Sequence, residues 1–202
     1  MTLKISDKSP ESPPSNMNTR RSPIAATLAE GISDSEFVHP TDLIKIGIKG
    51  RALAQWAAAL GIDFPPALYD TRPVGDHGLL ARVGSGEIVL ESLPNDPLLA
   101  SLQRGLEQPS PGIYRVEQQA VTFELSGPHA LGVFAQTCGL EIKACEPRRI
   151  VFTRVAGVSC GLIPLDRDGG VIYRFWVDYT FAPYLWNTLA EILGEIRSGG
   201  GR

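Results

Sequence analysis

Three histidines and two glycine-containing segments are the residues of this sequence whose types could support chemistry. The histidines are His39, His77 and His129, and none has a second histidine at helical spacing or a cysteine close by in sequence. Zinc sites on a helix pair two histidines one turn apart, so this spacing favours surface or capping roles. A Ser/Cys–His–Asp arrangement stays open, because such groups meet only in the folded chain.

The two glycine-containing segments resemble ligand loops without the rest of the pattern. Residues 166–170, Asp-Arg-Asp-Gly-Gly, resemble a calcium loop that lacks the later acidic ligands and the terminal glutamate. Residues 84–86, Gly-Ser-Gly, lie between two expected strands, whereas a phosphate loop precedes a helix. Both are more typical of turns. The sequence therefore assigns no catalytic, cofactor-binding or metal-binding residue to this chain.

The main candidate for an interaction surface is one face of the strand expected at residues 170–178. Alternation places Arg174 and Trp176 on that face, together with Ile172 and Asp178. Trp and Arg are the residue types most enriched at protein interfaces, which favours a surface for a partner. The alternative is that helices cover both faces of the sheet and that Arg174 pairs with Asp178 or extends to solvent.

The periodicity of apolar residues predicts the elements that position these side chains. Alternation predicts strands at residues 42–48, 78–83, 86–92, 113–125, 149–156, 158–165 and 170–178, and the strand at 113–125 is expected to bend near Gln118 and Gln119. Helical spacing predicts helices at 50–60, from Pro97 through Leu106, after Pro128, and from Pro183 onward. Three prolines predict a structured loop at 64–77.

A short passage occurs twice, and the repeat predicts the architecture. Residues 52–63 and 130–141 share Ala, Leu, Ala and Gly at the same offsets, and an alternating apolar stretch precedes each copy. Both copies predict a strand, a tight turn and an amphipathic helix that ends at glycine. The fold class is therefore α+β, with two related halves of antiparallel sheet and helices packed on one side.

The composition divides the chain into four parts. Residues 1–35 are rich in Pro and Ser and predict a flexible arm, in which Arg21 and Pro23 are the candidate contacts to a partner. The first α+β half is expected at 41–112, the second at 113–197, and a frayed tail at 198–202.

The overall composition excludes several classes of protein. The 202 residues are 43% hydrophobic and 20% charged with a net charge of -3, which gives no basic surface for nucleic acid. No apolar run approaches the roughly 18 residues of a membrane span. Three cysteines without a CxxC pair indicate neither a disulfide framework nor a zinc site and fit a cytoplasmic location.

Several segments resemble the folate-binding aminomethyltransferase superfamily, and within it the gamma subunit of heterotetrameric sarcosine oxidase. The likeness covers roughly residues 20–196. The matching segments are residues 21–24, 123–128, 153–158, 173–178 and 181–186. The resemblance implies the fold of the N-terminal part of an aminomethyltransferase (T-protein).

The resemblance also implies a role and partners. It implies a non-catalytic, structural subunit of a flavin-dependent complex that oxidatively demethylates sarcosine or a related N-methyl amino acid and passes the one-carbon unit to tetrahydrofolate. The expected partners are alpha, beta and delta subunits, which would hold FAD, FMN, NAD, tetrahydrofolate and zinc. Related complexes act on N-methylglutamate as dehydrogenases.

Two further interpretations stay open. One is a stand-alone folate-binding aminomethyltransferase-like protein with a pocket between the halves. The chain lacks the length for the C-terminal barrel of full-length aminomethyltransferases and the Lys-Gly-Cys signature of folate-dependent repair proteins. The other is a regulator that binds a small molecule in the same pocket.

Overall fold

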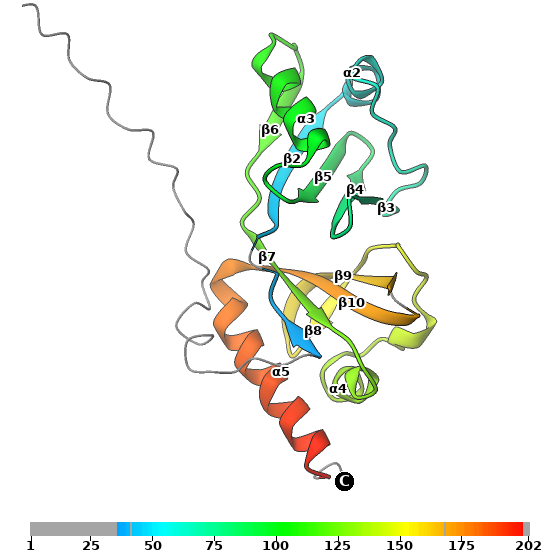
Figure 1. Ribbon diagram of the computed structural model, residues 1–202, viewed down its shortest axis with the longest axis vertical. Helices are drawn as coiled ribbons and strands as arrows, with labels where there is room; N and C mark the ends of the chain where they lie inside the picture. Colours follow the sequence, from blue (N-terminus) through cyan, green and yellow to red (C-terminus); the bar gives the residue numbers. More distant parts are fainter. Residues whose placement is uncertain (1–35, 41, 168, 200–202) are drawn as a thin grey trace, which may run out of the picture.

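The computed structural model describes residues 36–40, 42–167 and 169–199. The expected arm at 1–35, with Arg21 and Pro23, lies outside the described residues, and so does most of the expected frayed tail. Within the described part, two antiparallel sheets of five strands each carry four α-helices (Figure 1). This arrangement confirms the predicted α+β class.

The first sheet has the strand order β3-β4-β5-β2-β6. Its elements, in chain order, are β2 (Ile44–Gly50), α2 (Leu53–Ala59), β3 (Thr71–Val74), β4 (Gly78–Gly84), β5 (Glu87–Ser92), α3 (Pro97–Glu107) and β6 (Ile113–Val116). Asp96 caps α3 as its sequence predicts, since the Asp96 side chain accepts a hydrogen bond from the Leu98 N–H at 2.8 Å.

The second sheet has the strand order β1-β7-β10-β9-β8. Its elements are β1 (Phe37–Val38), β7 (Ala120–Leu125), α4 (Ala130–Thr137), the 3-10 turn η1 (Ile142–Ala144), β8 (Val151–Val155), β9 (Val158–Arg167), β10 (Gly170–Asp178), the 3-10 turn η2 (Tyr179–Phe181) and α5 (Ala182–Arg197).

The two sheets have the same connectivity, which confirms the two related halves. Each half runs strand, helix, three-strand meander, helix, and the last strand of the meander pairs with the first strand of the half. β5 pairs with β2 in one sheet, and β10 pairs with β7 in the other. The repeated passage at residues 52–63 and 130–141 contains the equivalent helices α2 and α4.

The segment at residues 113–125 differs from the expectation of the sequence analysis. Residues 113–125 were expected as one strand that opens the second half, with a bend near Gln118 and Gln119. In the structure, β6 pairs with β2 in the first sheet and β7 pairs with β10 in the second. The chain passes from one sheet to the other at residues 117–119, where the bend was expected. Alternation reports which residues share a face and not which sheet they join, so the pattern indicated the bend but not the change of sheet.

The loop expected at 64–77 also differs, because it contains β3. Pro73 lies on this strand opposite Leu79. β3 is at the edge of its sheet, where a proline without an N–H does not interrupt the ladder.

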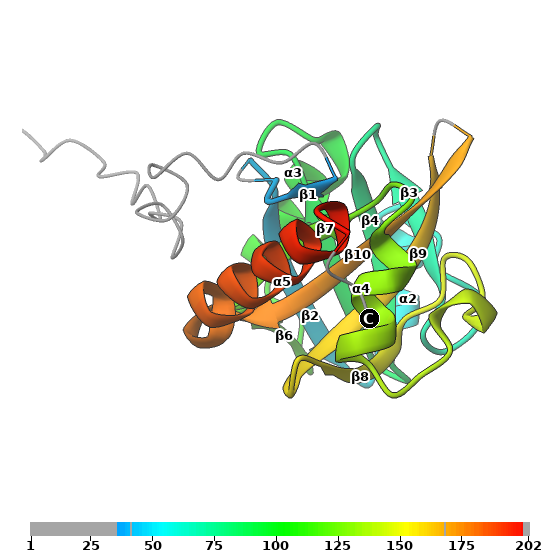
Figure 2. The same cartoon turned by 90° about the horizontal axis from the view of Figure 1, so that it is seen from below.

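The helices cover the outer faces of the two sheets, and the inner faces meet (Figures 1 and 2). α2 and α3 pack on the first sheet around a core that includes Ile48 and Leu90. α4 and α5 pack on the second sheet around a core that includes Phe175 and Trp186. Between the sheets lies a smaller apolar cluster, made of Leu79, Ala81, Val89, Ile150, Ile163 and Trp176. No helix within the described ranges is long and apolar enough to cross a membrane.

The turn between β8 and β9 is formed by Ala156 and Gly157. Both residues have positive φ angles, +47° and +80°, and Val155 pairs with Val158 across the turn. This is the pattern of a type I′ turn, which favours Asn-Gly. An alanine in the left-handed region is strained by contact of its Cβ with the backbone.

We expect Ala156→Asn to stabilise the protein by about 0.5–1 kcal/mol, because Asn adopts the left-handed conformation with less strain. Urea unfolding at neutral pH measures the difference. Gly157→Ala is the opposing control and should destabilise the protein. If both substitutions shift stability in the same direction, the turn geometry does not explain the effect.

Candidate functional site

The candidate site lies between the two sheets, where strand alternation directs polar side chains inward. On β5, Val89 and Glu91 face the other sheet while Ile88 and Leu90 face the helices. On β10, Arg174 and Trp176 face the first sheet while Phe175 faces α5. The inner face of each meander therefore combines charge with apolar contact.

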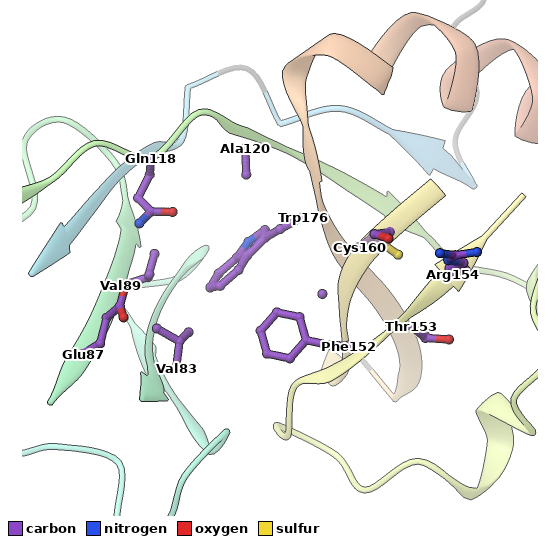
Figure 3. Close-up of a pocket in the computed structure, with 12 residues that line it drawn as sticks. Val83, Glu87, Val89, Gln118, Ala120, Phe152, Thr153, Arg154, Cys160 and Trp176 are labelled. Atoms are coloured by element: carbon purple, nitrogen blue, oxygen red, sulfur yellow. The ribbon is translucent and has the colours of Figure 1, made fainter. Parts of the chain in front are cut away.

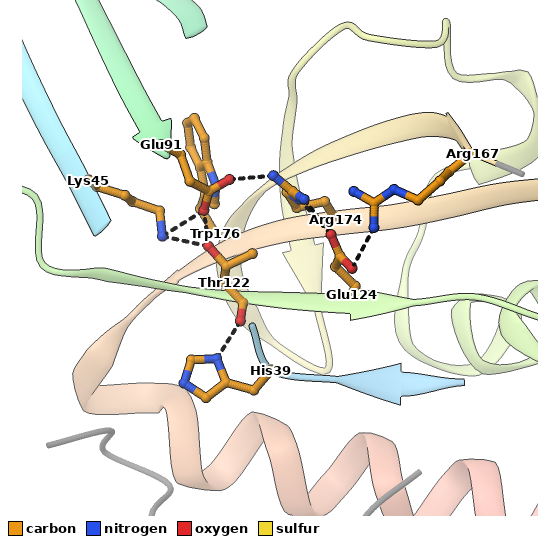
Figure 4. Close-up of polar contacts among 8 residues, drawn as sticks. All are labelled: His39, Lys45, Glu91, Thr122, Glu124, Arg167, Arg174 and Trp176. Atoms are coloured by element: carbon orange, nitrogen blue, oxygen red, sulfur yellow. Dashed lines mark hydrogen bonds and ion pairs between the residues drawn. The ribbon is translucent and has the colours of Figure 1, made fainter. Parts of the chain in front are cut away.

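Glu91 has no exposed surface and is the centre of a buried polar network (Figure 4). Its Oε2 accepts a hydrogen bond from Arg174 Nη1 at 2.7 Å, and its Oε1 is 2.9 Å from Lys45 Nζ. Oε1 also accepts hydrogen bonds from Trp176 Nε1 at 3.1 Å and from the Thr122 hydroxyl. One carboxylate therefore binds four donors, which lie on three strands other than β5. Two of the donors are cations.

A second carboxylate extends the network. Glu124 Oε1 accepts a hydrogen bond from Arg174 Nε at 2.9 Å, and its Oε2 is 3.3 Å from Arg167 Nη1. Arg174 is 1% exposed and bridges Glu91 of the first sheet to Glu124 of the second. Breaking such a buried pair leaves an uncompensated charge, so these contacts join the sheets firmly.

The network lies where equivalent positions of the two halves meet. Lys45 pairs with Glu91 across β2 and β5, and Thr122 pairs with Trp176 across β7 and β10. If the alternating apolar residues of β2 and β7 are superposed, Lys45 corresponds to Thr122. The two corresponding pairs contact each other, because Lys45 donates to Thr122 and Trp176 donates to Glu91. Equivalent positions of the two halves therefore contact each other across the sheets, but they carry different residue types.

The environment of Glu91 favours its charged form. Burial alone would raise its pKa, but the charges of Lys45 and Arg174 and the hydrogen bond from Thr122 outweigh burial and hold the pKa below its usual range. For His39, in contrast, burial outweighs the other contributions and favours the neutral form. Burial lowers the pKa of His39, whose Nδ1 donates to the Thr122 carbonyl at 2.7 Å in the neutral form.

We expect stability to fall as the pH drops, in two stages. Both folded-state pKa values are depressed, so both groups stabilise the fold above their unfolded values and lose this contribution as protons bind. The loss of stability through His39 begins below about pH 6.5, and the loss through Glu91 begins below about pH 4.5. Urea unfolding across this range should show a weaker pH dependence in His39→Gln above pH 5 than in the wild type, whereas the exposed His77→Gln should follow the wild type. Parallel curves for all three proteins would contradict the role of His39.

A pocket of about 550 Å³ opens beside the network, between the sheets (Figure 3). Its apolar walls include Trp176 and Val89, together with Phe152, which is 60% exposed. Its polar lining includes Glu87 and Arg154. Neither side chain forms an ion pair within the described part of the chain. Apolar walls with a few convergent polar groups are typical of a ligand or partner site.

Two of the three cysteines, Cys145 and Cys160, are favoured in the thiol form. Burial raises the pKa of the Cys160 thiol to about 12, and burial also raises the pKa of Cys145. His129 is 3.2 Å from Glu36 and ties the start of α4 to the segment before β1. Among the residues that the structure describes, no group of three or more His, Cys, Asp or Glu side chains could hold a metal ion.

The structure does not place Arg174 and Trp176 on a surface for a partner, which was the interpretation that the sequence favoured. Arg174 and Trp176 do face an interface, but its other side is the first sheet of the same chain, and both side chains are buried. Arg174 does not pair with Asp178, which instead accepts a hydrogen bond from the Thr180 N–H at 2.9 Å. The expected covering by helices is also wrong for this face, because a sheet covers it. Arg21 and Pro23 lie outside the described residues.

Sequence reasoning missed the acidic half of the network. Glu91 follows the apolar run Ile88–Leu90, and Glu124 lies between Phe123 and Leu125. A carboxylate inside such a run is a detectable signal, since an unpaired charge is rarely buried. The partner of each carboxylate is not detectable, because Arg174 is 83 residues from Glu91.

Comparison with known proteins rests on structure. No protein-family model and no curated protein sequence matches this chain. One similar structure is a chain of the heterotetrameric sarcosine oxidase from Corynebacterium sp. U-96 in complex with pyrrole 2-carboxylate. Its TM-score is 0.68 at 21% identity, over 87% of this chain and 95% of that chain. Another similar structure is the glycine cleavage system aminomethyltransferase T from Bartonella henselae, with a TM-score of 0.59 at 14% identity over 76% of this chain.

The extent of each match differs. The chain spans 44% of the length of the aminomethyltransferase but nearly all of the sarcosine oxidase chain. At these identities the likeness concerns the fold. The doubled arrangement of sheet and helices is therefore an aminomethyltransferase-like fold.

Proposed function

We propose that this chain is the non-catalytic gamma-type subunit of a sarcosine oxidase-like heterotetramer. The complex would oxidatively demethylate sarcosine or a related N-methyl amino acid in the cytoplasm and pass the one-carbon unit to tetrahydrofolate. Alpha, beta and delta subunits are the proposed partners. They, and not this chain, would hold FAD, FMN, NAD, tetrahydrofolate and zinc.

The observation that carries the proposal is the structural match to a sarcosine oxidase chain, which covers 95% of that chain and 87% of this one. The match to the aminomethyltransferase covers 44% of that chain.

The chemistry between the sheets supports a structural role. Glu91 is saturated by donors of its own chain, and Arg174 bridges two carboxylates. A general base needs a lone pair within reach of its substrate, and a buried, fully bonded carboxylate provides none. These charged groups are better suited to joining two sheets than to turning over a substrate.

Purification of the tagged chain from its native cells tests the proposal. We expect the chain to elute with three other polypeptides, with flavin absorbance and with sarcosine-dependent formation of peroxide. If N-methylglutamate reduces an artificial electron acceptor instead, the complex is of the dehydrogenase type. The chain produced alone should show neither flavin absorbance nor turnover. Turnover of a methylated amine by the isolated chain would contradict the proposal.

The pocket between the sheets favours one second candidate, a folate-binding protein that acts alone. Its aromatic walls, Trp176 and Phe152, could stack on a flat heterocycle, and Glu87 and Arg154 offer an acceptor and a donor. Calorimetry of the isolated chain with tetrahydrofolate distinguishes the candidates. Tight binding that Phe152→Ala weakens would favour the folate role, and the absence of heat would favour the subunit role.

A further inference from the structure

A second, smaller pocket between the sheets is lined by three arginines. It has a volume of about 180 Å³, and Arg148, Arg167 and Arg174 contribute to its lining. The three residues come from the loop before β8, from β9 and from β10. This pocket shares Arg174 with the buried network but none of its lining residues with the larger pocket.

Arg174, which lines the pocket, has N–H donors to spare. Arg174 is 1% exposed and makes three hydrogen bonds, two to Glu124 and one to Glu91. Each of its three nitrogens thus has a partner. A guanidinium group carries five N–H donors, so Nη1 and Nη2 each keep a second N–H for a ligand.

The arginine at the mouth of the pocket is held in place by its backbone. Arg148 has a φ of +59°, which is strained for an arginine. The Arg148 carbonyl accepts hydrogen bonds from the Thr71 N–H at 2.8 Å and the Thr71 hydroxyl at 2.9 Å, and its N–H donates to Pro164 at 2.7 Å. Contacts to both sheets thus maintain a strained residue at the pocket. Its guanidinium forms no hydrogen bond or ion pair within the described ranges.

Among the charged residues that line the pocket, three are arginines and two are aspartates, so the lining has one more cation than carboxylates. Glu124 is shared by Arg167 and Arg174, and Glu91 is shared by Arg174 and Lys45. Asp76 and Asp166 also line the pocket, but both are exposed, and neither forms an ion pair with the arginines in the described structure. Alternation along β9 directs Asp166 to the face opposite Arg167.

We propose that this pocket binds a small monocarboxylate, which the guanidinium groups of Arg148, Arg167 and Arg174 hold. Planar guanidinium groups match carboxylate oxygens in paired hydrogen bonds. Two of these arginines, Arg174 and Arg167, already bind the carboxylate of Glu124 (Figure 4). The neighbouring carboxylates would repel a dianion such as phosphate, which favours a single negative charge. The volume exceeds what one water molecule needs.

Calorimetric titration of the full chain with acetate, glycine and a blocked glutamate peptide tests the inference, at constant ionic strength maintained with chloride. The inference does not rest on the subunit role, so the isolated chain is sufficient. Saturation by acetate or glycine assigns the site to a free carboxylate. Saturation by the peptide alone assigns it to an acidic side chain of a partner. Binding of none of the three, or tighter binding of phosphate, overturns the proposal.

Charge variants locate the site. Arg148→Gln and Arg167→Gln should each weaken binding by at least about tenfold, whereas Arg154→Gln, which removes an unpaired arginine at the larger pocket, should leave binding unchanged. Arg148→Lys keeps the charge but loses the paired geometry and should also weaken binding. It provides a second test if Arg167→Gln does not fold. Equal losses in Arg148→Gln and Arg154→Gln would show a general charge effect and overturn the proposal.

Discussion

Replacing Glu91 with alanine should destabilise the protein by about 3–5 kcal/mol, because the substitution leaves two buried cations without their shared carboxylate. The side chains of Lys45 and Arg174 are 4% and 1% exposed. They cannot be hydrated unless the two sheets separate. Thr122 and Trp176 also lose an acceptor. Urea unfolding followed by tryptophan fluorescence measures the loss, since Trp176 reports on this interface.

Glu87→Ala is the matched control for this experiment. Glu87 lies on the same strand and the same face as Glu91 but is partly exposed and has no ion-pair partner in the described part of the chain. Its removal should change stability by less than about 0.5 kcal/mol. The role of the network would be contradicted if Glu91→Ala cost no more than the control. Replacing both Glu91 and Lys45 with leucine and methionine should cost less than Glu91→Ala, because only one cation is then left with fewer partners.

Phe37→Ala should cost about 3–5 kcal/mol, although Phe37 lies on a strand of only two residues. The Phe37 side chain has no exposed surface and stacks on Trp186 with ring centroids 4.3 Å apart. Phe123 lies edge-on to Phe37 at 5.6 Å, and Phe175 lies at 6.4 Å. The substitution therefore opens a cavity at the centre of the second-half core.

Val38→Ala controls for the strand itself. Val38 is 38% exposed and keeps the same backbone pairing to Glu124. It should cost less than about 1 kcal/mol, because little apolar area is lost. Chemical denaturation of both variants gives the comparison. Similar losses in Phe37→Ala and Val38→Ala would show that backbone pairing, and not the aromatic cluster, holds β1.

The start of the folded body shows where sequence reasoning falls short. Phe37 follows a segment of low apolar content, so its composition predicts no core residue there, and the first strand was expected to begin at 42. In the structure, β1 completes the second sheet through pairing with β7, and the paired residues are 86 and 88 positions apart in the chain. A strand of two residues is too short to show an alternating pattern of apolar residues. Only its pairing with a distant strand defines it.

Local patterns were more reliable for the meanders and helices. The turns at residues 84–86 and 156–157, the cap at Asp96 and the helix from Pro183 onward follow from interactions within a few residues. The buried network does not, because Arg174 was detected as unusual while its partners Glu91 and Glu124 were not. Strand alternation reveals an unusual face but not what covers it.

The sequence by itself determined the order of the four helices and of the strands other than β1, β3 and β6, the duplication of one α+β unit and the placement of Arg174 and Trp176 on a single face. These follow from backbone periodicity and turn chemistry, which act over short stretches of chain. The tertiary structure alone decided that the two sheets face each other, that Glu91 neutralises Lys45 and Arg174, and that β1 and β6 extend the two sheets. Such contacts join residues far apart in sequence, and they form because buried charge and apolar surface must find partners in the folded chain.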